Sequence, residues 1–201
     1  MHPPFTSVAG LQLAVVCMTL ILSGIDPRIS LAAYSGLSLA AVLLFARIYS
    51  LQIMIVLIAV GVSSAMVLGI GRFRGLPSIR EIRKITPKLV FRVLLSLILC
   101  GLAYFIEPAV ALWIPVPDSI IYASLVLLME GIFVISLETD VLNYIIGILS
   151  IFWGFQMVYM ILERSILVFA FMSGILLLIS LTGSFMLNSE EDHSGESGDS
   201  E

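Results

Sequence analysis

Long apolar runs separated by short stretches of charge or proline fill the chain from residue 8 to residue 187. A helix needs about 20 mostly apolar residues to cross the hydrocarbon core of a bilayer. Seven runs come close to this length: residues 8–25, 29–46, 51–70, 89–106, 119–137, 141–162 and 166–187. The pattern predicts an all-α, polytopic membrane helical bundle of about seven transmembrane helices, with residues 1–187 as the membrane domain.

Prolines are expected to end two of these helices. Pro27 follows Asp26 and should close the first helix, because proline lacks an amide hydrogen and disfavours helical geometry in the residue before it. Prolines after the fourth run should end it near residue 106 and leave residues 109–114, with Trp113, as a short interfacial segment. These prolines are Pro108, Pro115 and Pro117.

The junction between the second and third runs is the weakest in the chain. It carries only Arg47, Tyr49 and Ser50 as polar residues. A single longer, broken helix at this point would reduce the count from seven helices to six. Both readings are kept open by the sequence.

Composition agrees with the hydropathy pattern and excludes other classes. The chain has 201 residues, of which 60% are hydrophobic and 12% charged, and its mean hydropathy is +1.12. Soluble, disordered and disulfide-stabilised proteins do not have this composition. Cys17 and Cys100 each lie inside an apolar run and are expected to be packing residues.

Basic residues are distributed unevenly between the two sides of the predicted bundle. With seven crossings, one side collects eight of the ten Lys and Arg residues, and Arg47 and Arg164 lie on the other. The positive-inside rule predicts that the N-terminus lies outside and the C-terminus in the cytoplasm. The expected location of this multi-pass protein is the cell membrane. The eight residues are Arg28, Arg72, Arg74, Arg80, Arg83, Lys84, Lys88 and Arg92.

The basic cytoplasmic loop, residues 71–88, has an amphipathic pattern. Ser78 can cap a short helix with Glu81 three residues later, and isoleucines recur at helical spacing. The segment is expected to lie at the membrane surface against anionic headgroups, or alternatively to dock a partner subunit. Nucleic-acid binding is not expected of a small patch held against a membrane.

The C-terminal segment, residues 188–201, is strongly acidic and has almost no apolar residue to bury. It is predicted to be a disordered cytoplasmic tail. His193 stands alone among its carboxylates, so a metal site there is not expected.

No catalytic constellation is visible in the sequence. The two histidines, His2 and His193, lie near the termini, and no phosphate-binding glycine loop or zinc-protease motif is present. The chain is therefore not expected to be an enzyme or to hold a cofactor or a metal.

One acidic residue lies deep inside a predicted membrane helix. Glu130 is roughly 12 Å from the end of the fifth run near Glu138, whereas Arg92 enters the fourth run from the same side by roughly 6 Å. An intramembrane carboxylate is costly and marks a candidate functional site. Glu130 could be neutral or paired with Arg92, holding two helices together, or it could transfer protons or coordinate an ion.

Small residues at four-residue spacing point to close contact between helices rather than to a substrate site. Gly36 with Ala40, and Gly61 with Ala65, follow this spacing in the second and third runs. Small residues let helix backbones approach closely in a membrane.

Two stretches resemble the E subunit of hydrogenase-4-type complexes, whose C-terminal half is related to the K subunit of respiratory complex I. They are Tyr34-Ser35-Gly36-Leu37-Ser38-Leu39-Ala40, and the run from Val141-Leu142-Asn143-Tyr144 through to Gly154. The resemblance implies a helical scaffold over residues 8–187 with a basic loop after the third helix.

The sequence departs from that family at the charged positions. The family has a Glu-Asn pair where Phe152 and Trp153 stand, and a lysine near Ser63 and Ser64. Its further acidic positions fall near Ala170 and Leu176, and Glu130 matches none of them. The resemblance therefore implies a shared scaffold without shared proton transfer.

Three hypotheses follow. The first is a non-catalytic membrane subunit of a complex I-like or membrane-bound hydrogenase assembly, whose partners would be membrane lipid and other membrane subunits. The second is a small transporter or channel that uses Glu130 to bind a proton or cation. The third is a free-standing membrane protein that shares only the hydrophobic layout.

Overall fold

Seven α-helices and no strand are present in the computed structural model, which describes residues 5–24, 26–46, 48–73, 87–163 and 165–196. Six of these helices are long and apolar enough to cross a membrane, and α1 contributes a shorter apolar stretch, Val8–Ser23. The predicted all-α, multi-pass membrane bundle is confirmed. The helices are α1 (Phe5–Ser23), α2 (Pro27–Phe45), α3 (Leu51–Phe73), α4 (Pro87–Ala111), α5 (Asp118–Leu137), α6 (Val141–Leu162) and α7 (Ile166–Glu196).

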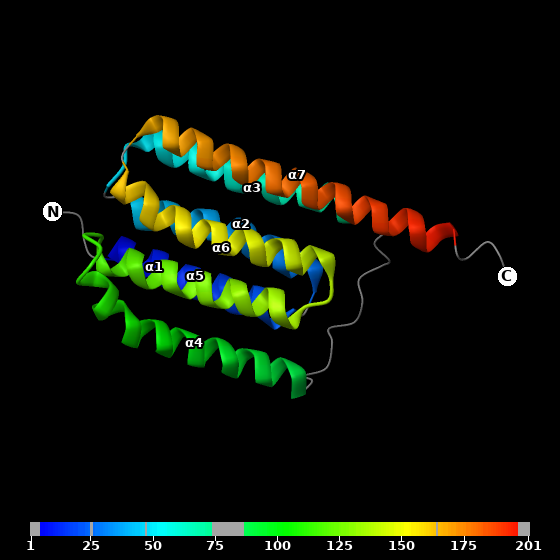
Figure 1. Cartoon of the computed structure of the whole chain (residues 1–201), viewed down its shortest axis with the longest axis horizontal. Helices are drawn as coiled ribbons and strands as arrows, with labels where there is room; N and C mark the ends of the chain where they lie inside the picture. The colour runs from blue at the N-terminus through cyan, green and yellow to red at the C-terminus, as the bar shows by residue number, and fades with distance from the viewer. Residues whose placement is uncertain (1–4, 25, 47, 74–86, 164, 197–201) are drawn as a thin grey trace.

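The helices form two rows with one helix at the edge (Figure 1). In the first row α2 lies between α1 and α3, and in the second α6 lies between α5 and α7. The rows face each other, so that α1 packs on α5, α2 on α6 and α3 on α7, while α4 packs on α1 and α5. Consequently α2, α5 and α6 are the most buried helices, and α3, α4 and α7 keep broad apolar faces exposed.

Facing helices of the two rows run in the same direction, because α4 adds one crossing between the rows (Figure 1). The C-terminal ends of α1 and α5 therefore meet at the same end of the bundle. This end, marked by Ser23, Arg92 and Leu137, is called the Arg92 end below.

Local sequence sets the predicted helix ends. Asp26 caps α2 by accepting a hydrogen bond from the backbone N–H of Arg28 at 2.9 Å, and Pro27 occupies the first turn, where its missing amide hydrogen costs nothing. In the next junction Ile48 and Tyr49 donate backbone hydrogen bonds to the Phe45 carbonyl at 2.9 and 3.1 Å. This turn separates α2 from α3, so the prediction of seven helices is confirmed and the alternative of six is wrong.

The fourth helix extends further than predicted. It continues through Pro108 to Ala111, so the expected end near residue 106 was wrong. Near the C-terminal end of a helix a proline removes one backbone hydrogen bond while the flanking bonds remain, and an exposed proline ring meets no neighbour. Trp113 lies in the turn that follows and is 88% exposed.

The seventh helix also extends further, to Glu196. Residues 188–196 were expected to be disordered but continue the helix, since each added residue gains one backbone hydrogen bond and glutamate is a good helix former. The end of the acidic tail, residues 197–201, and most of the basic loop, residues 74–86, lie outside the described residues.

Glycines bring backbones into contact at the centre of the second row. A Cβ atom on Gly131 of α5 would lie 3.0 Å from the Gly147 carbonyl oxygen of α6, and one on Gly147 would lie 3.1 Å from the Gly131 oxygen. Gly61, predicted to mark a close contact, meets Ser38 of α2 so tightly that a Cβ would overlap it. Lipid provides no hydrophobic driving force for helices to associate, so close van der Waals packing of this kind stabilises the contact between them.

Candidate functional site

Glu130 is completely buried and faces α4. The Ser96 hydroxyl donates a hydrogen bond to Glu130 Oε1 at 2.7 Å, and the Cys100 thiol donates a weaker one to the same oxygen at 3.4 Å. The second oxygen, Oε2, has no hydrogen-bond partner. Arg92, Ser96 and Cys100 recur every fourth residue, which places all three on one face of α4.

A hydroxyl chain extends this contact to α1. Thr19 Oγ1 lies 2.9 Å from Ser96 Oγ and also within 2.9 Å of the Val15 carbonyl oxygen, to which it can donate. Together Thr19, Ser96, Cys100 and Glu130 form a polar cluster, called the Glu130 cluster below, that joins α1, α4 and α5. Such contacts between helices are the usual way in which polar groups are satisfied in a membrane.

Arg92 takes Glu138 as its partner instead of Glu130. Its guanidinium Nη1 forms an ion pair with Glu138 Oε1, and the two side chains are only 4% and 10% exposed. Glu130 therefore has no basic partner among the described residues. Glu138 was predicted only to mark the end of the fifth run, although a charge directly after a membrane helix is a natural partner for a buried arginine nearby.

The Arg92 guanidinium also caps two helices. Nη1 donates to the Ser23 carbonyl oxygen at 3.3 Å and Nη2 to the Leu137 carbonyl oxygen at 3.2 Å. These residues are the last of α1 and α5, where carbonyl groups lack a partner within the helix and the helix dipole is negative. The Arg92 cation thus neutralises one carboxylate and donates hydrogen bonds to carbonyl oxygens at the ends of two helices.

Gly24 makes room for this contact. Its φ of +57° is in the left-handed region that favours glycine, and a Cβ at this position would overlap both the Arg92 guanidinium and the Glu138 carboxylate. The Gly24 N–H donates to the Ile21 carbonyl oxygen at 3.2 Å, which ends α1.

A second buried polar group lies between the two rows. The Tyr34 hydroxyl of α2 is 2.9 Å from Ser64 Oγ of α3 and accepts a hydrogen bond from Trp153 Nε1 of α6 at 3.3 Å. Trp153 is 1% exposed, so it is a core residue and not a residue of the lipid interface. The three side chains, called the Tyr34 triad below, connect three helices through neutral groups.

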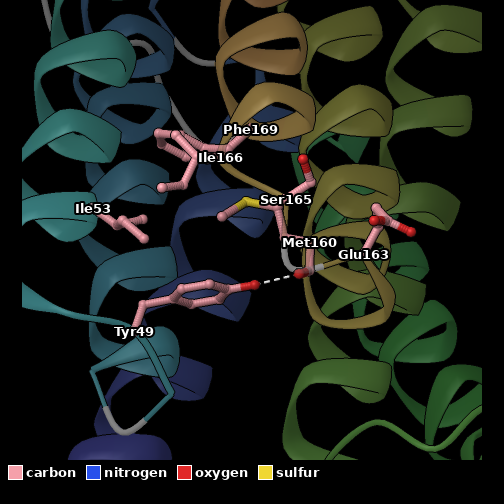
Figure 2. Close-up of a pocket in the computed structure, with 7 residues that line it drawn as sticks. All are labelled: Tyr49, Ile53, Met160, Glu163, Ser165, Ile166 and Phe169. Atoms are coloured by element: carbon pink, nitrogen blue, oxygen red, sulfur yellow. Dashed lines mark hydrogen bonds between the residues drawn. The ribbon is translucent and has the colours of Figure 1, made fainter.

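A small pocket lies at the end of the bundle opposite the Arg92 end, where the turn between α2 and α3 meets α6 and α7 (Figure 2). Tyr49, Ile53, Met160 and Phe169 are among its lining residues, and the Tyr49 hydroxyl donates to the Met160 carbonyl oxygen. Its volume of about 20 Å³ is close to that of a single water site. The pocket is too small for a substrate, and Tyr49 serves there to tie the turn to the end of α6.

Among the described residues, no group of three or more His, Cys, Asp or Glu side chains is placed to hold a metal ion. The chemistry of the described interior is therefore that of one buried carboxyl, one buried ion pair and a set of neutral hydrogen bonds. Comparisons with protein-family models, with curated proteins and with solved structures return no significant match to this chain.

Proposed function

We propose that this chain is a non-catalytic integral membrane subunit that helps to hold the membrane arm of a complex I-like or membrane-bound hydrogenase assembly. The Tyr34 triad is the observation that carries the proposal. The resemblance to the hydrogenase-4-type E subunit puts a lysine near Ser64 and a Glu-Asn pair where Phe152 and Trp153 stand.

Where the resemblance would place these charges, this chain has Ser64 and Trp153, two neutral residues of the Tyr34 triad that both bond to the Tyr34 hydroxyl. Ser64 and Trp153 come from different rows, and both reach the Tyr34 hydroxyl, at 2.9 and 3.3 Å. All three side chains are almost completely buried. A proton path needs groups that gain and release protons, whereas this arrangement fixes α2, α3 and α6 against one another. An arrangement that fixes three helices against one another is suited to a scaffold subunit.

The buried charges at the Arg92 end support the same function. Arg92 is bound to Glu138 and to the ends of two helices, so its charge is used to hold α1, α4 and α5 together. The exposed apolar faces of α3, α4 and α7 offer surfaces to lipid or to neighbouring membrane subunits. The excess of Lys and Arg around the loop after α3 favours an orientation with that loop in the cytoplasm, and we place the protein in the cell membrane as part of the same proposal.

Copurification tests the proposal. The full chain with a C-terminal tag is extracted from its native membrane in a mild detergent, and the copurifying proteins are identified by mass spectrometry. The expected result is a stable set of redox-complex membrane subunits that is absent when an unrelated multi-pass protein carries the same tag. Elution of the chain with lipid alone would rule the scaffold function out.

A second candidate function is translocation of protons or cations through Glu130. It is favoured by the unpaired Oε2 atom of a carboxyl that is otherwise completely enclosed. Flux into liposomes that contain the purified chain should then fall on Glu130→Gln. The control is Ser150→Ala, because the Ser150 hydroxyl is also buried but bonds only the Ile146 carbonyl of its own helix. Equal flux in wild type and Glu130→Gln would count against this function.

A further inference from the structure

Within the part of the chain that the structure describes, no counter-charge is available for a carboxylate at Glu130. On α4 the nearest basic residue is Arg92, and its charge is already matched by Glu138. The helices α1 and α6 carry no charged residue between Phe5 and Ser23 or between Val141 and Leu162, and the other titratable groups near Glu130 are Cys100 and Tyr122. A carboxyl buried without a cation takes up a proton instead of remaining charged.

We propose that Glu130 is a proton-binding site, in which the carboxyl holds a proton reversibly and the Ser96 and Thr19 hydroxyls reverse the direction of their hydrogen bonds when it does. The proposal goes beyond the scaffold and translocation functions, because a proton can be bound without crossing the membrane. Its failure would leave the scaffold function and cation translocation standing, and it would exclude only proton translocation through Glu130.

The hydroxyl chain can satisfy either form of the carboxyl. When Glu130 is ionised, Ser96 donates to Oε1, and Thr19 donates to Ser96 or to the Val15 carbonyl. When Oε1 carries the proton, it donates to Ser96, Ser96 donates to Thr19, and Thr19 donates to Val15. The only covalent change is one O–H bond at Glu130, which forms with a proton taken from water and breaks when the proton returns to water. The two hydroxyl groups only rotate.

The unpaired oxygen fits the protonated form. With the proton on Oε1, every hydroxyl in the chain has an acceptor, and Oε2 is left as a carbonyl oxygen without a donor. A buried carbonyl oxygen without a partner is tolerated more often than a buried donor without one. An ionised carboxylate with the same bare oxygen would be far more costly.

A proton suits the Glu130 cluster better than a metal cation. Hard cations require several oxygen ligands arranged around them. Here one carboxylate is approached by a hydroxyl and a thiol on the same oxygen, and no larger set of acidic or His side chains gathers among the described residues.

Infrared spectroscopy of the full chain in hydrated liposomes tests the proposal. The spectrum of Glu130→Gln is subtracted from that of wild type over a range of pH. At neutral pH the difference should contain the C=O band of a protonated carboxylic acid, which gives way to carboxylate bands at high pH. Carboxylate bands at neutral pH would overturn the proposal. This comparison requires only wild type and Glu130→Gln, in which the buried side chain keeps its size and polarity.

Two further variants should move the pH midpoint of this band in opposite directions. Ser96→Ala removes a hydrogen bond that is stronger to the charged carboxylate than to the neutral acid, so the midpoint should rise by about one pH unit. Thr19→Val removes the acceptor that Ser96 needs only in the protonated form, so the midpoint should fall by about half a unit.

The matched control is Ser150→Ala, which should leave the midpoint unchanged because the Ser150 hydroxyl donates to the Ile146 carbonyl of its own helix and is not a hydrogen-bond partner of Glu130. Equal shifts in the control and in Ser96→Ala would overturn the role of the hydroxyl chain. The titration is repeated with sodium and potassium replaced by choline. An unchanged midpoint is expected, and a midpoint that depends on the small cation would overturn the assignment to a proton.

Discussion

Arg92 and Glu138 illustrate how a few buried side chains determine the stability of one end of the bundle. Removing only the cation, as in Arg92→Met, would leave Glu138 buried without a counter-charge and the ends of α1 and α5 without a donor. Loss of one partner of a buried ion pair typically costs about 3–5 kcal/mol. We expect Arg92→Met to lower the free energy of unfolding in detergent by about this amount.

The matched test is a double-mutant cycle with Glu138→Met. The double variant should be more stable than Arg92→Met alone, because replacing both partners of a buried pair by apolar groups removes the desolvation cost together with the attraction. Thermal unfolding followed by circular dichroism measures all four proteins. Additive losses would show that the two residues do not depend on each other.

Gly24 is predicted to be intolerant of substitution for two separate reasons. Alanine at this position would be held at a positive φ of about +57° and would overlap the Arg92–Glu138 pair. The backbone penalty by itself is about 1–3 kcal/mol. We expect Gly24→Ala to reduce stability by at least this much in the same unfolding assay.

Gly174→Ala is the control for Gly24→Ala. Gly174 lies within α7, and a Cβ there would meet no atom within 4 Å. Alanine in a helix interior is favoured over glycine by about 0.5–1 kcal/mol. The two substitutions should therefore change stability with opposite signs, and a loss of equal size in both would contradict the role assigned to Gly24.

At the scale of helices, the contact between α5 and α6 depends on the absence of side chains. Gly131→Ala would place a Cβ 2.8 Å from Ile151 Cγ1 and 3.0 Å from the Gly147 carbonyl oxygen. Overpacking of this kind usually costs about 1–3 kcal/mol. We expect this loss in the unfolding assay, whereas Gly101→Ala in α4, where a Cβ meets nothing within 4 Å, should cause none.

The sequence predicted the presence of each helix correctly, whereas it predicted the positions of the helix ends less accurately. The turn after α1 has strong local signals in Asp26 and Pro27, and it was predicted correctly. The end of α4 was not, because the cost of Pro108 depends on whether its ring faces a neighbouring helix, which periodicity does not reveal. The extension of α7 to Glu196 was not predicted either, because a helix can continue beyond the apolar run from which it was predicted.

At the scale of the whole molecule, the predicted orientation can be tested by fusions. A reporter fused after Glu201 should be cytoplasmic, since most Lys and Arg residues lie on the side to which the C-terminus returns. The matched fusion after Ser165, in the turn between α6 and α7, should read as non-cytoplasmic. A non-cytoplasmic reporter at Glu201 would overturn this orientation.

The arrangement of the helices in two rows could not be read from the sequence. Every run is apolar around most of its circumference, so hydropathy does not tell which face of a helix meets another helix and which meets lipid. Small residues were the exception, since Gly61 was predicted to mark a close contact and does so against Ser38.

By itself the sequence determined the class of this protein: a bundle of mostly apolar membrane helices in a known order, with the Glu130 carboxyl deep inside one of them. The choice between six and seven helices needed the structure. Crossing a bilayer is a local property, because length, hydropathy and internal backbone bonds decide it within each segment. Tertiary structure alone decided which residues meet, as in Arg92 with Glu138, Glu130 with Ser96, and Tyr34 with Trp153. These partners lie far apart in the chain, and only the rotation and neighbours of each packed helix bring them together.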